Sequence, residues 1–461
     1  MPQITPPVKH LVKHLVRHPG ARRLALGGGA AKLGGAASSV RCVMSNLAYK
    51  IDILVIGGGQ AGLSSAYHLQ KLGLKGGKGY LVLDKSPQPG GAWQFRWPSL
   101  TMRTVNRLHD LPGMGFAEVL DPGQTEVRAA EAVPAYFRAY EERFHLPVYR
   151  PVTARLVCDR GERLRVETDR ETFSARGIIN ATGTWDAPQI PYYPGRELFL
   201  GRQMHTHDYH RPEEFAGQRV AIVGAGISAL QMLDEISRVT DTIWLTRRPP
   251  EFRDAEFTAE DGRAAVARVE DRVRQGLIPG SVVSVTGIPY NPAIRAMQAR
   301  GVLNRQPMFS EITPTGLRWP DGREEAVDII LWATGFRSAL DHLSPLQLRE
   351  ENGGIRMTGR LATQVARDPR VHLVGYGPSA STIGANRAGG AAARELVEQL
   401  AARGPLPMAA VPLTIEADVF GSDPRRPDEL SVLRGQATVA KTSGDVRAVR
   451  LVPANPPARP E

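Results

Sequence analysis

The chain has 461 residues, of which 42% are apolar and 23% charged, and these values exclude disordered, collagen-like and fibrous proteins. The length predicts two to four domains. No run of 18 apolar residues is present, so we expect no transmembrane segment. The net charge is +11, but residues 1–43 hold seven Lys and Arg without any acid, whereas the rest holds 51 against 47. The rest is therefore nearly neutral, which argues against nucleic acid as a partner.

Residues 1–43 form a basic extension. Val8, Leu11 and Leu15 recur at helical spacing between basic residues, an amphipathic pattern. An export signal at Arg22-Arg23 and attachment to a membrane surface are two alternatives. We expect instead a disordered tail, or a native start at Met44 that makes the extension a mis-assigned start.

The two cysteines, Cys42 and Cys158, stand 116 positions apart. Two cysteines exclude a disulfide framework and a zinc site of four thiolates. The absence of a C-x-x-C motif argues against a dithiol redox pair. The pattern favours a reducing cytoplasm, and we expect no metal site.

Along residues 44–404 the sequence alternates between apolar strands and helices, which predicts an α/β fold. Two segments have the order strand, glycine turn, helix, strand. They lie at 51–83 and at 219–246, with helices over about 63–72 and 228–238. Between them we expect a helix over 131–145, a hairpin over 165–174 and a strand over 177–181. A third segment has strands at 328–333 and 371–375 and a helix from about 388 to 403.

The first glycine turn fits the dinucleotide pattern G-x-G-x-x-G with Gly57, Gly59 and Gly62. The first glycine allows the tight turn, the second lets the backbone approach a pyrophosphate, and the third lets helix pack on strand. Asp84 ends the next strand, 22 residues after Gly62, where an acid binds ribose hydroxyls. We group Lys85, which follows Asp84, with this nucleotide site.

The second turn has Gly224 and Gly226, followed by Ser228, with Ala229 in the third position. Its second strand ends in Arg247-Arg248 instead of an acid. A guanidinium binds a 2′-phosphate by charge-assisted hydrogen bonds, whereas a carboxylate would repel it. The second site should therefore prefer NADPH, unless these arginines are ordinary solvated charges. An acid-ended site accommodates FAD or NAD, so FAD with NADPH is the simplest pair of cofactors.

From about Ile51 to Arg403 the sequence resembles the flavin-containing monooxygenase group, the class B flavoprotein monooxygenases. Its N-/S-oxygenating, YUCCA-type and related bacterial members are the nearest in motif. The most specific element is Phe199-x-Gly201-x-x-x-His205-x-x-x-Tyr209, which lies just before the second glycine motif, as in the family. The resemblance also rests on the two glycine motifs, Gly90-Gly91-Ala92-Trp93, and the paired segments Ala181-Thr182-Gly183 and Ala333-Thr334-Gly335.

The resemblance implies roles for several of these residues. Gly91 and Trp93 would lie beside the flavin, although Trp93 could simply pack in the core. A helix after Ser381 would direct its positive end at the flavin, where Asn386 either contacts the cofactor or caps the helix. The Ala-Thr-Gly segments would be structural elements where the chain crosses between domains.

His205 is a candidate acid or base because its ordinary pKa is near 6.5. In the family, however, the histidine of this motif shapes the linker between domains. The neighbouring His207 and His210 suggest a metal site as a further alternative, which we consider weaker because the family motif already accounts for His205.

Two residues are candidates for a catalytic role, Arg103 and Asn106. Ungapped alignment places Arg103 where Baeyer–Villiger relatives carry an aspartate and where N-/S-oxygenating relatives carry an asparagine. The departure argues against a ketone-to-ester reaction. Arg103 could bind an acidic substrate or a nicotinamide phosphate, or could form a structural ion pair.

The expected architecture is an α/β flavoprotein with two Rossmann-like dinucleotide-binding domains, the FAD domain being discontinuous with an inserted NADPH domain. We assign 1–43 to the basic extension, 44–183 to the first part of the FAD domain and 184–326 to the NADPH domain. The second part of the FAD domain is 327–404, and 405–461 is a partly disordered C-terminal extension.

The resemblance implies an NADPH-consuming, FAD-dependent monooxygenase that forms a flavin C4a-hydroperoxide and oxygenates a small organic substrate with O₂. One alternative is an NADPH-dependent flavoprotein reductase that passes electrons to a quinone or protein. A second is a non-enzymatic flavoprotein regulatory module. The sequence leaves the substrate and the oligomeric state open, including a homo-oligomer.

Overall fold

The computed structural model describes residues 48–105, 108–254, 259–280, 287–404, 414–423, 426–438 and 452–453. The basic extension 1–43 lies outside these residues. The chain divides into two units, residues 43–404 and the two ends, 1–42 with 405–461. In the expected C-terminal extension the described residues form the antiparallel strands β20 (Thr414–Asp423), β21 (Arg426–Thr438) and β22 (Val452–Pro453). Residues 43–404 carry two larger sheets.

The first sheet has nine strands and is built around a parallel core. Its order is β17-β18-β19-β6-β1-β2-β3, with β5 pairing antiparallel to β6 and β4 to β5. Strands β19, β6, β1, β2 and β3 are parallel neighbours. The bounds are β1 (Tyr49–Ile56), β2 (Tyr80–Leu83), β3 (Val148–Tyr149), β4 (Ala154–Arg160), β5 (Arg163–Thr168), β6 (Thr172–Asn180), β17 (Met357–Thr358), β18 (Gln364–Val365) and β19 (Val371–Leu373). The hairpin expected over 165–174 is the pairing of β5 with β6.

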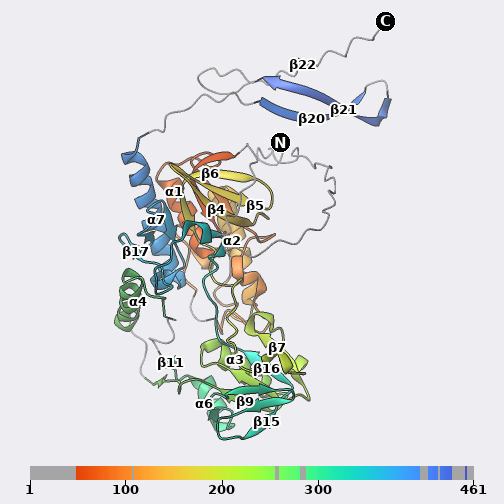
Figure 1. Ribbon diagram of the computed structural model, residues 1–461, viewed down its shortest axis with the longest axis vertical. Helices are drawn as coiled ribbons and strands as arrows, with labels where there is room; N and C mark the ends of the chain where they lie inside the picture. The colour runs from red at the N-terminus through yellow and green to blue at the C-terminus, as the bar shows by residue number, and fades with distance from the viewer. Residues whose placement is uncertain are drawn as a thin grey trace, which may run out of the picture. The chain divides into compact units, whose positions relative to one another are not determined.

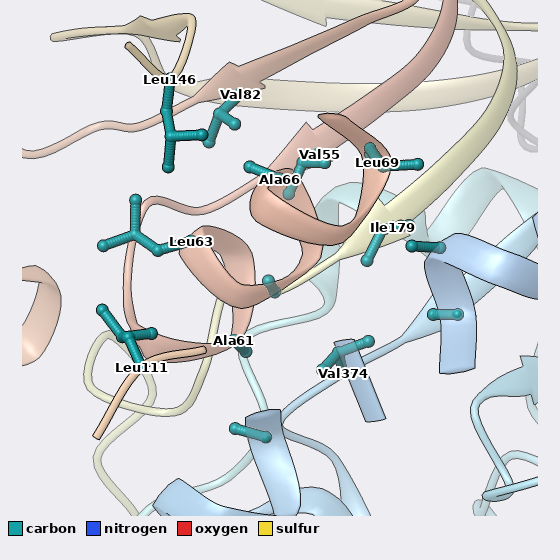
Figure 2. Packing of buried hydrophobic residues seen from close by; sticks show 14 of the residues in the cluster. Val55, Ala61, Leu63, Ala66, Leu69, Val82, Leu111, Leu146, Ile179 and Val374 are labelled. Carbon is teal, nitrogen blue, oxygen red and sulfur yellow. The ribbon is translucent and has the colours of Figure 1, made fainter. Parts of the chain in front are cut away.

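The core of this part lies between the sheet and three helices, α1 (Gln60–Lys71), α2 (Ala129–Phe144) and α7 (Thr382–Ala402). Parallel strands covered by helices are apolar along their buried length, as the sequence Ile53–Ile56 shows. Figure 2 shows Val55, Val82 and Ile179, from three neighbouring strands, beside Ala66 and Leu69 of α1. This packing fixes the start of α1 at the end of β1.

Helix α7 begins at Thr382, six residues before the predicted start at 388. The predicted start was wrong because Gly384 weakens the helical pattern before residue 388, whereas Gly389 and Gly390 lie inside the predicted helix. The structure gives two of these glycines a packing role, since a β-carbon at Gly389 would lie 3.0 Å from the Ser64 hydroxyl and one at Gly390 2.9 Å from the His68 ring. The glycines therefore allow α7 to approach α1 closely.

The second sheet is wholly parallel, with order β12-β9-β8-β16-β7. Its strands are β7 (Arg202–His205), β8 (Val220–Val223), β9 (Thr242–Leu245), β12 (Arg305–Gln306) and β16 (Ile329–Trp332). Figure 1 shows β7, β9 and β16 grouped with α3 (Ile227–Ile236) and α6 (Pro292–Ala299). Strand β16, which follows the predicted boundary at 326/327, pairs with β8 in this sheet. The domain bounds themselves stay a prediction.

The remaining described elements lie in sequence between β9 and β16, and one of them, α4 (Ala259–Arg274), packs with Val273 in the core of the first sheet. Helix α4 lies in sequence between β10 (Phe252–Arg253) and β11 (Ile288–Pro289), which form a short parallel pair. A small antiparallel sheet consists of β13 (Glu311–Thr313), β14 (Gly316–Arg318) and β15 (Glu324–Ala326). Within the described part of the chain, no helix is both long and apolar enough to cross a membrane. The predicted α/β class, with a first domain interrupted by a second, is confirmed.

Gly62→Ala should destabilise the fold, whereas Gly59→Ala should not. A β-carbon at Gly62 would lie 1.8 Å from the Gly57 carbonyl oxygen, while nothing lies within 4 Å of one at Gly59. We expect Gly62→Ala to lower the free energy of unfolding by about 3 kcal/mol, and Gly59→Ala by no more than about 1 kcal/mol. Urea unfolding of the FAD-free protein measures both, and equal losses for the two variants would contradict this account of the turn.

Candidate functional site

The first glycine turn is held by a carbonyl group of a neighbouring strand end. Gly57 has φ +110°, and a β-carbon there would lie 2.4 Å from the carbonyl oxygen of Ala181, which follows β6. Only glycine fits this combination of conformation and close approach. Gly59 faces open space instead, as the predicted approach to a pyrophosphate requires.

A cavity of about 510 Å³ opens at this turn. It brings together most of the residues predicted for the first nucleotide. Those residues are Gly57, Gly59, Asp84, Lys85, Gly91 and Trp93. Further lining comes from Thr182–Asp186, Phe336 and Ser379–Thr382, which are remote in sequence. Because Thr182–Asp186 and Phe336 belong to the two segments that cross between the sheets, the cavity extends from the glycine turn to that crossing.

Asp84 lies buried at the end of β2, where the sequence predicted a ribose ligand. Its carboxylate accepts a hydrogen bond of 3.2 Å from Arg150, which also pairs with Glu141 of α2. The backbone N–H of Ser86 donates to the other carboxylate oxygen. These contacts fix the orientation of Asp84. Sequence reasoning missed Arg150 because it lies 66 positions away and in no motif.

Lys85 lines the cavity and forms an ion pair with Asp186. The pair links the loop after β2 to the segment that leaves the first sheet. Both side chains are partly exposed, so the pair adds little stability. The ion pair instead holds the Lys85 and Asp186 segments of the cavity wall beside each other.

An aromatic cluster forms the wall beside the crossing segments. The Trp185 ring stacks on Phe336 at 5.3 Å between centroids and lies 4.6 Å from the His207 ring. Arg96 lies over the Trp185 ring, with its guanidinium carbon 4.5 Å from the centroid. Trp93 flanks the same guanidinium at 5.6 Å. The sequence singled out Trp93 but not Trp185 or Arg96, which no motif marks.

The start of helix α7 also lines the cavity. Ser381 caps the helix by accepting a hydrogen bond from the N–H of Gly384, so the capping role considered for Asn386 is wrong. The Asn386 amide instead accepts from Gln60 and donates to the carbonyl oxygen of Asp110. Asn386 is not among the lining residues, and its expected contact with a cofactor stays a prediction.

The second glycine turn repeats the construction of the first. Gly224 has φ +142°, and a β-carbon there would lie 2.3 Å from the carbonyl oxygen of Ala333, which follows β16. A β-carbon at Gly226 would meet nothing within 4 Å. Ala229 is buried in α3, whose first turn also contains Ser228. This turn therefore has the same open position for a phosphate.

Arg247 and Arg248 follow β9 and are exposed, as a site for a 2′-phosphate requires. Beside them Thr246 donates to the carbonyl oxygen of Arg248 and accepts 2.7 Å from Arg305 Nε. Arg305 begins β12 and adds a third positive charge to this strand end. Sequence reasoning missed Arg305, because the pairing of β12 with β9 does not follow from the apolar pattern of the sequence.

His205 has a structural place. It is 1% exposed, its Nε2 lies 2.9 Å from the Gly335 carbonyl oxygen, and its Nδ1 accepts from the N–H of His207. Burial lowers its pKa. Both ring nitrogens are thus engaged within the protein, which supports the linker role and leaves neither free for a metal or a substrate proton.

The two candidate catalytic residues are not brought to the cavity. Arg103 is 66% exposed and pairs with Glu126 at 2.7 Å, the structural alternative considered from sequence, and it is not a lining residue. This geometry therefore does not support a catalytic Arg103. The expectation came from an alignment without gaps, which cannot account for a loop of different length. Asn106 lies outside the described residues.

The residues present fit a dinucleotide in the first cavity. Gly59 faces open space on the side where a β-carbon would lie. Two buried polar atoms of lining residues, Gln60 Oε1 and Arg96 Nε, have no hydrogen-bond partner. Such orphaned atoms are rare in proteins and indicate a missing partner. The second turn fits a nucleotide through Gly226 and the three arginines near β9.

Comparison with known proteins agrees with this geometry. The family model for pyridine nucleotide-disulphide oxidoreductases matches residues 54–282. A flavin-containing monooxygenase from Stenotrophomonas maltophilia is 37% identical, with a TM-score of 0.63 over 76% of this chain and 99% of that one. The oxidoreductase CzcO of Bacillus velezensis is 26% identical over 299 residues, covering 63% of this chain and 82% of that protein. An indole-3-pyruvate monooxygenase of Oryza sativa subsp. japonica is 26% identical over 320 residues, covering 62% and 76%.

Two Rossmann-type sheets, each with a glycine turn open to a nucleotide, define an oxidoreductase that works with two dinucleotides. The chain belongs to the flavin-containing monooxygenases. It is accordingly a flavin-dependent monooxygenase, and its cofactors are FAD and NADPH. The non-enzymatic alternative is thereby set aside.

Gly59→Ala and Gly226→Ala should each weaken the binding of one nucleotide. A methyl group at either position would enter the space left open for a phosphate. We expect Gly59→Ala to raise the Kd of FAD, and Gly226→Ala that of NADP⁺, by at least about tenfold, which corresponds to about 1.4 kcal/mol. Flavin fluorescence and calorimetric titration measure the two constants. Each variant is the control for the other, and a loss of both nucleotides in either one would contradict the assignment.

Proposed function

We propose that the protein is an NADPH-consuming monooxygenase that oxygenates a small organic substrate, by N- or S-oxygenation or related chemistry. NADPH supplies two electrons, one atom of O₂ enters the substrate, and the other leaves as water. Bound FAD supplies the oxygen-activating chemistry, through the C4a-hydroperoxide expected from the family. The single observation that carries the proposal is the cavity that runs from the first glycine turn to the segments crossing between the sheets.

The chain's own residues bind and shield in this proposal. The glycine turn and the start of α7 direct backbone N–H groups at the cofactor. Trp93, Trp185 and Phe336 supply an apolar wall at the crossing. Exclusion of water strengthens each electrostatic contact and prevents wasteful side reactions. In agreement with this division of work, the lining acids Asp84 and Asp186 are both ion-paired, and the lining His342 is held by Asn180.

The NADPH side rests on the second sheet. Gly226 leaves room for the pyrophosphate, and Arg247, Arg248 and Arg305 surround the end of β9 with positive charge. An exposed guanidinium can form two parallel hydrogen bonds with a phosphate. We assign the NADPH domain to 184 through the end of β16 and the FAD domain to the flanking segments. The cytoplasm remains the expected compartment.

Rapid mixing of the NADPH-reduced protein with oxygenated buffer, without substrate, should give a persistent oxygenated-flavin absorbance. The shielding of the cavity predicts that this state outlives direct reoxidation. Immediate return to oxidised flavin with release of hydrogen peroxide would contradict the proposal and favour a reductase that serves a quinone or protein. A second rapid-mixing experiment with an added quinone then shows whether the reduced flavin passes its electrons to that class of acceptor.

Arg247→Gln should reduce the preference for NADPH over NADH. Loss of a charge-assisted hydrogen bond to the 2′-phosphate should raise the KM for NADPH by about tenfold, with the KM for NADH changed less than about twofold. Steady-state NAD(P)H oxidation measures both. Arg238→Gln is the matched control, because Arg238 is also exposed on this domain but pairs with Asp234. Equal effects of Arg247→Gln on the two nucleotides would contradict the 2′-phosphate site.

A further inference from the structure

Arg96 holds a fixed position in the cavity wall. It follows a 3₁₀ turn over Gly91–Phe95 and lines the cavity. Its guanidinium lies between two indoles, 4.5 Å from the Trp185 centroid and 5.6 Å from the Trp93 centroid. Aromatic faces attract a guanidinium and restrict its plane. The side chain is therefore oriented before any ligand binds.

Arg96 has no counter-ion among the described residues. Its Nε is buried and has no hydrogen-bond partner. The two lining acids are already engaged, Asp84 with Arg150 and Asp186 with Lys85. Burial lowers the pKa of Arg96 to about 10, so the group stays positively charged at neutral pH. A buried charge that lacks a partner is costly.

Two other arginines with mostly buried side chains have acidic partners. Arg150 pairs with Asp84 and Glu141, and Arg370 with Asp368 and Asp159. Cation–π contact with two indoles offsets only part of the burial of a charge, because it supplies no hydrogen-bond acceptor for the N–H groups. What Arg96 lacks is an anion, and it faces the space where ligands bind.

We propose that Arg96 binds the anionic group, a carboxylate or a phosphate, of a ligand in this cavity. The assignment rests on the proposed function, since it takes the cavity as the ligand site. A planar guanidinium held between indoles suits two parallel hydrogen bonds to such a group. Two sources share this chemistry: a phosphate of FAD or NADP⁺, and the carboxylate of an acidic substrate.

Arg96→Gln and Arg96→Lys test the proposal in the full-length holoprotein. Three equilibrium constants are measured without turnover. FAD retention is followed by the flavin fluorescence released on dilution. NADP⁺ binding is followed by the flavin spectrum at saturating FAD, and benzoate binding in the same way against neutral benzamide. Arg138→Gln is the matched control, because Arg138 is exposed and donates to Gln88 outside the cavity.

Arg96→Gln should weaken one of the three anionic ligands by about 10- to 100-fold, and Arg96→Lys should recover part of the loss. Loss of FAD or of NADP⁺ identifies that nucleotide as the source of the anion. Loss of benzoate alone, with benzamide unchanged, identifies a substrate carboxylate.

Unchanged affinity for both nucleotides, together with no charge-dependent binding of benzoate, overturns the proposal. Equal losses in Arg96→Gln and Arg96→Lys also overturn it, because packing against the indoles would then explain the effect. These constants do not depend on the fate of oxygen. A reductase outcome in rapid mixing therefore leaves the test of Arg96 intact.

Discussion

A backbone carbonyl pressed against a glycine underlies both nucleotide sites. The strands that pair parallel with β1 and β8 are β6 and β16, and each is followed by an alanine, Ala181 or Ala333. The carbonyl oxygen of that alanine leaves no room for a β-carbon at Gly57 or Gly224. The contact sets the positive φ of the turn and directs the chain into the following helix. The alanine carbonyl contacts each turn at its first glycine, and the second glycine, Gly59 or Gly226, faces open space. The Ala-Thr-Gly segments are thus part of the turns as well as linkers between the sheets.

The same two segments are also hydrogen-bonded to each other. The N–H of Ala339 donates to Gly183, the Thr182 hydroxyl to the carbonyl oxygen of Ala339, and the N–H of Gln189 to Gly335. His205 adds its bond to Gly335 from the end of β7. The family motif that contains His205 is therefore explained by the crossing and needs no proton transfer. A buried neutral imidazole suits this place, since burial already lowers its pKa.

The sequence predicted what the backbone requires and missed what side chains do across long distances. Glycine turns, β1, α1, β8 and α3 follow from local rules, because strand end, turn and helix start are consecutive. The start of α7 was misplaced, because Gly384 in its first turn looks locally like a helix breaker. Strand β16 was expected in the second part of the FAD domain but pairs in the second sheet, because parallel strands of both sheets have the same apolar pattern. Arg103 was placed at the site by an alignment without gaps, whereas the loop carries it to an exposed pair with Glu126.

Charge in the cavity follows a rule that no local pattern contains. Each lining acid has a basic partner from another segment, Arg150 for Asp84 and Lys85 for Asp186. These pairs neutralise the acids, which would otherwise repel the phosphates of a dinucleotide. Arg96 is the exception among the described charged residues that line the cavity, since its partners are two aromatic faces. With both acids ion-paired, this charge makes the cavity attractive to anions, and burial makes the attraction stronger than it would be at the surface. The residue that we propose as the anion ligand therefore lies outside every motif. Motifs record the shape of the backbone, whereas Arg96 meets its two indoles only through folding.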